Sequence, residues 1–314
     1  MGQRAFTGTH GILAPGRFGN DNASCYAVQS CWRAAGRYTV MATDVQAERQ
    51  SIALPGQQEE LTVYVARPED DRAYPAVLLI HEAFGLDEHI AEVTRRLAAE
   101  GFVVVAPDLF SLDSFGRTVT PAEMMEGMRL RMALPPERRM DPAAMAEALA
   151  QLPEAQGTRL RQVLAWSAQR DNAALVPPLQ ELVAWARARS DTTAAVGVTG
   201  FCFGGGMTLR LAFAGAAIDA AAPFYGQNPP LEQAGQVRCP LLLMYGRNDP
   251  FIMPGLPALL GALHGAERSY ELHVYEQAGH AFLNDTRPDM YGRVAAEDAW
   301  HQLTRFFGQH LQAR

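Results

Sequence analysis

Hydrophobic residues along the chain follow two different periods, and the change between them predicts a sheet of mostly parallel strands. Residues 51–54 and 61–66 alternate apolar and polar side chains, as half-buried strands do, and we expect these two to pair antiparallel. Residues 76–80 and 102–106 are short, continuous apolar runs, which is typical of strands covered on both faces. A helical pattern at 89–100 joins them, so this part of the chain reads as a strand–helix–strand unit with parallel pairing.

The same alternation of strand and helix patterns continues toward the end of the sequence. The further predicted strands are 194–199, 220–224, 241–245 and 270–275, and the further predicted helices are 179–189, 204–214, 255–265 and 294–311. We therefore expect one α/β domain over residues 41–314, with a doubly wound, mostly parallel sheet and helices on both faces.

Two segments depart from this pattern. Glycines interrupt residues 1–40, which we expect to be a poorly ordered tail; Met41 is an alternative start of the natural chain. Residues 113–171 are rich in methionine and predict a helical insertion, in which three methionines spaced four residues apart from Met124 to Met132 form one helical stripe. We favour core packing for this stripe over a methionine-lined lid that closes on a ligand.

Composition and charge exclude several classes of function. The chain has 27 basic and 34 acidic residues, a formal charge of −7, and all of the basic residues are arginine. The lack of lysine excludes Schiff-base chemistry and a lysine-dependent phosphate loop, and the acidic balance argues against a nucleic-acid partner. With neither an apolar run of about 18 residues nor a signal-peptide pattern, we expect a cytoplasmic protein with no membrane partner.

The four cysteines have unrelated spacings, which predict neither a disulfide framework nor a zinc site. They are Cys25, Cys31, Cys202 and Cys239. We expect no catalytic role for the first two, which fall in the predicted tail.

One of these cysteines lies in the most informative motif of the chain. Residues 200–205 read Gly-Phe-Cys-Phe-Gly-Gly, directly between a predicted strand and a predicted helix. This is the nucleophile-elbow pattern with Cys202 in place of serine, and the following helix N-terminus favours a thiolate. The alternatives are a buried structural cysteine or a dinucleotide-binding turn; the sequence does not fit the G-x-G-x-x-G pattern that such a turn requires, and Phe201 and Phe203 would obstruct a pyrophosphate.

The residues that such a nucleophile needs follow in the order typical of this elbow. Asp249 and then His280 lie in loops after two later predicted strands. His280 would accept the Cys202 proton or hold it as an ion pair, and Asp249 would orient the imidazole. The backbone N–H groups of Phe203 and Ala83 are the candidate oxyanion donors.

Glu82 contributes a carboxylate to the same predicted pocket, from the loop after residues 76–80. His81 and Glu82 also invite a zinc-protease interpretation, but this requires a second histidine at position 85, which is Gly85. We therefore expect no metal and no other cofactor. A helix-capping role is the structural alternative for Glu82.

Together these motifs resemble the dienelactone hydrolase (carboxymethylenebutenolidase) family of the α/β-hydrolase fold, over about residues 50–312. The resemblance rests on six motifs: His81 to Leu86, Pro107 to Leu109, Gly200 to Gly205, Phe224 to Gly226, Gly246 to Asp249 and Gly279 to Phe282. It implies that Glu82 removes the thiol proton when an anionic lactone binds, that the thiolate opens the lactone to a thioester, and that water releases a dicarboxylate such as maleylacetate. It also implies substrate contacts from Phe84, Tyr225 and Phe282.

The chain departs from the best-known members at two positions that help to hold the substrate carboxylate. Those members have serine and arginine where this chain has Ala281 and Asn284. An arginine elsewhere is a candidate replacement, and the candidates are Arg117, Arg129, Arg131 and Arg287.

We therefore predict a cysteine-dependent hydrolase that opens a lactone or enol ester through a thioester. A broader carboxylesterase or thioesterase on the same residues is one alternative, and a non-enzymatic redox sensor that uses the Cys202 thiol is the other. The expected partner is a small-molecule ester; the natural substrate and the oligomeric state stay open.

Overall fold

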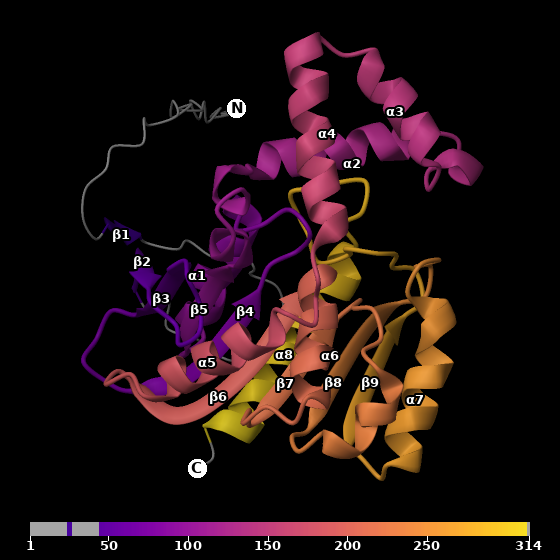
Figure 1. Ribbon diagram of the computed structural model, residues 1–314. Coiled ribbons are helices and arrows are strands. Elements are labelled where there is room, and N and C mark those ends of the chain that lie inside the picture. The colour runs from indigo at the N-terminus through magenta and orange to yellow at the C-terminus, as the bar shows by residue number, and fades with distance from the viewer. Residues whose placement is uncertain (1–23, 27–43, 313–314) are drawn as a thin grey trace, which may run out of the picture.

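A computed structural model describes residues 24–26 and 44–312 (Figure 1). The described part contains one mixed sheet of nine strands in the order β1-β2-β3-β5-β4-β6-β7-β8-β9. Its antiparallel part is β1 (Ser24–Tyr26), β2 (Val45–Ile52) and β3 (Leu61–Pro68), and β3 also pairs antiparallel with β5. Its parallel part is β4 (Tyr74–Ile80), β5 (Val103–Asp108), β6 (Thr192–Phe201), β7 (Ala220–Phe224), β8 (Leu241–Gly246) and β9 (Tyr270–Tyr275).

Helices cover both faces of this sheet. On one face lie α5 (Val176–Arg187), α6 (Phe203–Phe213) and α7 (Leu256–Gly265), and on the other lie α1 (Glu88–Ala99) and α8 (Arg293–Leu311). Alternate residues of β4 divide between the two cores, Leu78 on the α5 and α6 side and Leu79 on the α1 and α8 side. The predicted doubly wound α/β-hydrolase fold is confirmed.

The first long strand begins earlier than its pattern predicts. We expected a strand at 51–54, whereas β2 starts at Val45. Only Val45 and Ile52 of this strand are buried, and Glu48 and Arg49 are exposed. Because β2 lies near the edge of the sheet and its middle faces solvent, its central residues carry no apolar alternation that could reveal it.

Three helices form the segment between β5 and α5: α2 (Pro121–Ala133), α3 (Pro142–Ala150) and α4 (Glu154–Gln169) (Figure 1). Met124 is buried and Met128 half-buried against Phe84 and Phe110, so the start of the methionine stripe packs in a core. Met132 is 45% exposed, because α2 leaves this core before its last turn. The insertion thus contacts the loop after β4, which carries Phe84.

Most of the predicted tail, residues 1–40, lies outside the described residues; the exception is β1, whose three residues pair with β2. Within the described ranges, none of the helices combines the length and apolarity that crossing a bilayer requires.

Candidate active site

Cys202 occupies the turn between β6 and α6 in a conformation that few side chains adopt. Its φ is 55° and its ψ is −111°, and such backbone strain costs about 1–3 kcal/mol unless neighbouring structure imposes it. The Cys202 N–H donates to the Phe224 carbonyl at 3.1 Å, which ties the turn to β7. The side chain is half-buried, so the sulfur lies at the surface of the core rather than inside it.

The glycines around Cys202 are required by the close approach of α6 to the sheet. A Cβ on Gly204 would lie 2.0 Å from the Ile80 carbonyl oxygen, and one on Gly205 would lie 2.2 Å from the Phe224 carbonyl oxygen. Both distances are far below contact, so any side chain would push the helix away from β4 and β7. The glycines thereby set the first turn of α6 directly behind the cysteine.

His280 and Asp249 meet beside the elbow. The His280 Nδ1 lies 2.6 Å from the Asp249 Oδ2, and the His280 side chain is 18% exposed. Burial by itself would lower the pKa of His280, but its hydrogen bonds to Asp249 and Cys202 outweigh burial and raise that pKa to about 10. The imidazole is therefore held as an imidazolium at neutral pH.

The Asp249 carboxylate is fully supplied with donors. It is 1% exposed, and its Oδ1 accepts the backbone N–H groups of Phe251 at 3.0 Å and Ile252 at 3.1 Å. Its Oδ2 accepts a hydrogen bond from the His280 Nδ1. The turn after β8 thus fixes this negative charge with its own backbone.

Glu82 lies on the loop after β4 and is equally buried, but it is poorly supplied with donors. It is 2% exposed; its Oε2 accepts the Asn284 Nδ2 at 2.8 Å, and its Oε1 has no hydrogen-bond partner among the described residues. Burial raises the pKa of Glu82, against the lowering effect of His89 and of the Asn284 hydrogen bond. Burial thus favours the neutral form of this carboxyl group, which has fewer donors to stabilise its charge than Asp249 has.

His81 holds the loop that carries Glu82 and Ala83. Its Nδ1 lies 2.6 Å from the Glu82 carbonyl oxygen, and its Nε2 accepts the Leu109 N–H at 3.2 Å, so the neutral tautomer with the proton on Nδ1 satisfies both. Burial lowers the pKa of His81, which keeps the ring neutral. Among the described residues, the backbone N–H groups of Ala83 and Phe203 donate to no partner, so both are available to an oxyanion.

The three predicted substrate contacts lie in different surroundings. The Tyr225 ring lies 5.2 Å from that of His280, and burial, followed by the charges of Glu82 and Cys202, raises the pKa of its hydroxyl well above the usual value. Phe84 packs under the helical insertion. Phe282 is fully buried and packs 5.3 Å behind Tyr225, so its ring faces the core.

Two further residues beside the site escaped the sequence reasoning. His89 is 3% exposed, with its Nδ1 3.5 Å from the Asp285 Oδ1 and its Nε2 without a partner. Arg170 has its guanidinium over the ring of Phe203 at 4.8 Å, and burial lowers its pKa to about 10. The helical period of α1 places His89 on the buried face, which is a signal that the sequence carried; nothing in the sequence marks Arg170.

The four candidate arginines for a substrate carboxylate are not equivalent. Arg117 pairs with Glu59 and Arg129 pairs with Glu126, while Arg131 contacts the sulfur of Met140. Arg287 lies over the ring of Phe84 at 5.6 Å, next to the predicted oxyanion donor Ala83. Of the four, Arg287 is thus the one beside the site.

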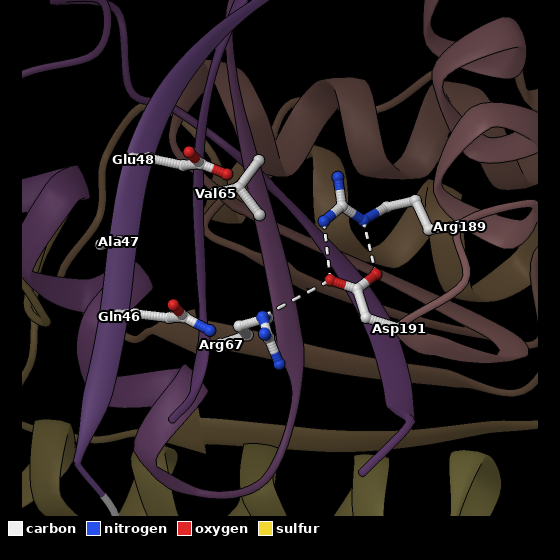
Figure 2. A pocket seen from close by; sticks show the side chains of 7 residues that line it. All are labelled: Gln46, Ala47, Glu48, Val65, Arg67, Arg189 and Asp191. Carbon is white, nitrogen blue, oxygen red and sulfur yellow. Dashed lines mark hydrogen bonds and ion pairs between the residues drawn. The ribbon is translucent and has the colours of Figure 1, made fainter. Parts of the chain in front are cut away.

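A polar hollow of about 250 Å³ lies away from this site, at the other end of the parallel strands (Figure 2). Its lining residues are Gln46, Ala47, Glu48, Val65, Arg67, Arg189 and Asp191. Asp191 pairs there with Arg67 at 3.7 Å and with Arg189 at 2.7 Å, so its charges are largely compensated. Ligands of open α/β sheets bind at the carboxyl ends of the strands, where Cys202 and His280 lie, and not at this end.

Across the described ranges, no three His, Cys, Asp or Glu side chains gather in a way that could hold a metal ion.

Known proteins share this sequence pattern over most of its length. The model of the dienelactone hydrolase family matches residues 61–311. A candidate carboxymethylenebutenolidase of Saccharolobus solfataricus is 32% identical over 248 residues, which cover 79% of this chain and 93% of the relative. A candidate carboxymethylenebutenolidase of Escherichia coli K12 is 28% identical over 270 residues, or 82% of this chain and 86% of the relative.

A solved structure gives the same result. The crystal structure of a candidate dienelactone hydrolase from Klebsiella pneumoniae matches with a TM-score of 0.60 and 28% identity, covering 84% of this chain and 99% of that one. The resemblance predicted from the motifs is confirmed, and with it the prediction of an enzyme that hydrolyses ester bonds. This chain belongs to the dienelactone hydrolase family.

Proposed function

We propose that this enzyme opens a lactone or enol ester by nucleophilic attack of Cys202 through a thioester intermediate. The observation that carries the proposal is the strained cysteine turn, with φ of 55°, beside an imidazole that is 2.6 Å from a buried aspartate. A side chain held in this conformation at a helix N-terminus is placed for attack, and the imidazole and carboxylate complete the set of groups that acyl transfer needs.

The first step is the removal of the thiol proton. His280 already carries its proton at neutral pH, because its pKa is raised to about 10. The ionised form of Glu82 then takes the proton of a neutral Cys202 thiol. The thiolate attacks the ester carbonyl carbon, and the free N–H groups of Phe203 and Ala83 stabilise the oxyanion.

The remaining steps restore the starting protonation states. As the ester C–O bond breaks, the His280 imidazolium gives its proton to the leaving oxygen. The neutral imidazole then takes a proton from water, whose oxygen attacks the thioester carbon. The C–S bond breaks, the acid product leaves, and Glu82 returns its proton to the Cys202 thiolate.

We assign the substrate side of the site to Tyr225, Phe84 and Arg287. Tyr225 lies beside His280, and Phe84 follows the oxyanion donor Ala83. The guanidinium of Arg287 lies over the Phe84 ring and supplies a positive charge that the neutral Asn284 does not. An ester that carries a carboxylate is therefore the preferred substrate class, as the family resemblance implies. Phe282 acts from behind, by packing against Tyr225.

The test combines substitution with detection of the intermediate. We expect Cys202→Ala to abolish hydrolysis of lactones and aryl esters, and Cys239→Ala, at a buried free cysteine, to preserve it. Mass spectrometry of the wild type with a slow ester should show one acyl group on Cys202. Full activity of Cys202→Ala would overturn the nucleophile, and a reversible sulfenic acid without ester turnover would favour the redox sensor.

A further inference from the structure

The Asn284 side chain is an uncharged amide in the core beside the site, and both of its polar atoms have partners. It is 1% exposed. Its Nδ2 donates to the Glu82 Oε2 at 2.8 Å, and its Oδ1 accepts the Thr286 N–H at 3.1 Å and the Thr286 hydroxyl at 2.6 Å. A buried amide is stable only when such hydrogen bonds replace those that it makes to water. The three residues thus form one connected chain of hydrogen bonds, which ends at the Glu82 carboxyl group.

Thr286 fixes which end of the amide faces Glu82. A backbone N–H can only donate, so the atom of Asn284 that meets the Thr286 N–H is the carbonyl oxygen. A reversed amide would place its NH2 group against that N–H and its oxygen against a carboxyl oxygen of Glu82. Both contacts would join partial charges of the same sign when Glu82 is ionised, so the amide is held with its donor toward Glu82.

The hydrogen bond from Asn284 makes the two oxygens of Glu82 unequal. Oε2 accepts the amide N–H, whereas Oε1 has no hydrogen-bond partner among the described residues. A hydrogen bond to a carboxylate oxygen stabilises its negative charge and lowers its affinity for a proton. The more basic oxygen of an ionised Glu82 is therefore Oε1. Because the donor is uncharged, it holds Oε2 more weakly than a cation would and leaves the carboxylate able to accept a proton.

The loop that carries Asn284 also carries His280, and its backbone holds the two at a fixed separation. The Asn284 N–H donates to the Ala281 carbonyl at 3.0 Å. Ala281 has a φ of 58°, a left-handed conformation that persists in a residue with a side chain only where the surrounding structure imposes it. The same loop therefore contacts both buried carboxyl groups of the site, Asp249 through His280 and Glu82 through Asn284.

We propose that Asn284 and Thr286 are positioning residues for Glu82, whose Oε2 they hold so that Oε1 is the atom that accepts the Cys202 proton. This inference rests on the proposed function, in which Glu82 is the base for that proton. In this step the S–H bond breaks, its electron pair stays on sulfur, and the proton binds Oε1 while Oε2 keeps its hydrogen bond. Asn284 and Thr286 take up no proton themselves, so their effect passes through Glu82.

The test is the rate at which iodoacetamide alkylates Cys202 at neutral pH, measured by mass spectrometry of the peptide that contains this cysteine. The reagent is uncharged and reacts with the thiolate, so the rate reports removal of the thiol proton without any turnover. We expect Asn284→Leu, which has a similar size but no donor, to lower the rate about tenfold, because the Glu82 carboxyl group is then free to turn away. An unchanged or higher rate would overturn the inference.

The matched control is Asn228→Leu. The Asn228 amide also bridges two segments of the chain, since its Nδ2 donates to the Gly255 carbonyl at 2.8 Å, but its partner is a backbone oxygen and not Glu82. This variant should keep the wild-type rate of Cys202 alkylation. A loss equal to that of Asn284→Leu would mean that any missing bridge disturbs the site, and the specific role of Asn284 would be contradicted.

A double substitution separates positioning from a general structural role. Glu82→Gln should lower the alkylation rate, and the addition of Asn284→Leu should lower it no further, because the amide acts through Glu82. An equal fold loss in both backgrounds would mean that Asn284 is structural. If Glu82→Gln alone keeps the wild-type rate, Glu82 is not the base, and the proposed function and the inference fall together. A lowered rate in Glu82→Gln with an unchanged rate in Asn284→Leu overturns the inference alone.

Two substitutions of Thr286 keep the inference falsifiable if Asn284→Leu folds poorly. Thr286→Val keeps the shape of the side chain but removes the hydroxyl, and the backbone N–H still holds the amide. We expect the alkylation rate and kcat for ester hydrolysis to fall about threefold, with KM unchanged. Thr286→Ser keeps the hydroxyl and should show the wild-type values. Equal values for Thr286→Val and Thr286→Ser would contradict the role of Thr286.

Discussion

The loop after β8 and the loop after β4 each bury one carboxyl group near His280, but they supply the two groups with different numbers of hydrogen-bond donors. Asp249 is 1% exposed and accepts two backbone N–H groups and an imidazole. Glu82 is 2% exposed and accepts one side-chain amide. Equal burial thus leaves one carboxyl group with three donors and the other with one, and burial raises the pKa of the second, Glu82.

The source of the donors explains the difference. Asp249 takes two of its three from the turn that immediately follows it, at Phe251 and Ile252. Glu82 takes its one donor from Asn284, 202 residues along the chain. A carboxylate held by its own turn keeps its environment as the site moves, whereas one held across the site changes with the position of the opposite loop.

The largest effect is expected from substitution of Asp249, the carboxylate with three donors. Asp249→Asn keeps the shape of the turn but removes the charge that orients the His280 imidazolium, and we expect kcat to fall by about 10⁴-fold, as in other triads. The Tm should change little by comparison. Steady-state kinetics and thermal unfolding of the same preparation check this. If activity and stability fall in step, Asp249 is a structural residue.

For Glu82, the carboxyl group with one donor, we expect a substitution that lowers activity but raises stability. Glu82→Gln removes the base that takes the thiol proton, so we expect kcat/KM to fall by about 10²-fold. Because the pKa of Glu82 is raised in the folded protein, the unfolded wild-type chain loses its proton first, and wild-type stability declines as pH rises above about 4.5. Glu82→Gln lacks this decline, so it should gain stability relative to wild type from pH 5 to pH 7 in urea unfolding. A destabilised variant at pH 7 would contradict this.

Sequence reasoning predicted the structure correctly where that structure depends on a local pattern. The elbow at Cys202 could be predicted because its glycines and its place between strand and helix are adjacent in the sequence. The parallel core strands could be predicted because burial on both faces requires continuous apolar runs. The structure brings Cys202, His280 and Asp249 together in the order expected for this fold.

What the sequence did not reveal depends on contacts between distant segments. The pairing of Asn284 with Glu82, and the packing of the Phe110 and Phe203 rings on Arg170, join residues from separate segments of the chain. Neither contact has a local spacing in the sequence that could mark it. The missed part of β2 has a different cause, since its exposed middle satisfies no burial pattern.

The raised pKa of His280 predicts how the stability of the wild type and that of Asp249→Asn should differ with pH. Its pKa is about 10 in the folded protein and near 6.5 when unfolded, so its stabilising effect is complete below pH 6.5 and is lost as pH rises toward 10. The slope contributed by this one group is at most about 1.4 kcal/mol per pH unit. Asp249→Asn should flatten that slope, so the stability gap between it and wild type should narrow from pH 7 to pH 10. If the free energy of unfolding changes with pH in parallel for the two proteins over this range, Asp249 and His280 are not coupled.

The smallest predicted effect concerns the substrate charge. Arg287→Gln removes the guanidinium over Phe84, and we expect KM for an ester that carries a carboxylate to rise about tenfold, the equivalent of 1.4 kcal/mol, with kcat nearly constant. A neutral ester of the same leaving group should be unaffected. The control is Arg129→Gln, which breaks an exposed pair with Glu126 on α2 and should alter neither substrate. An equal rise in KM for both esters would mean that Arg287 supports the Phe84 loop. The proposed role of Arg287 in binding an ester that carries a carboxylate would then be contradicted.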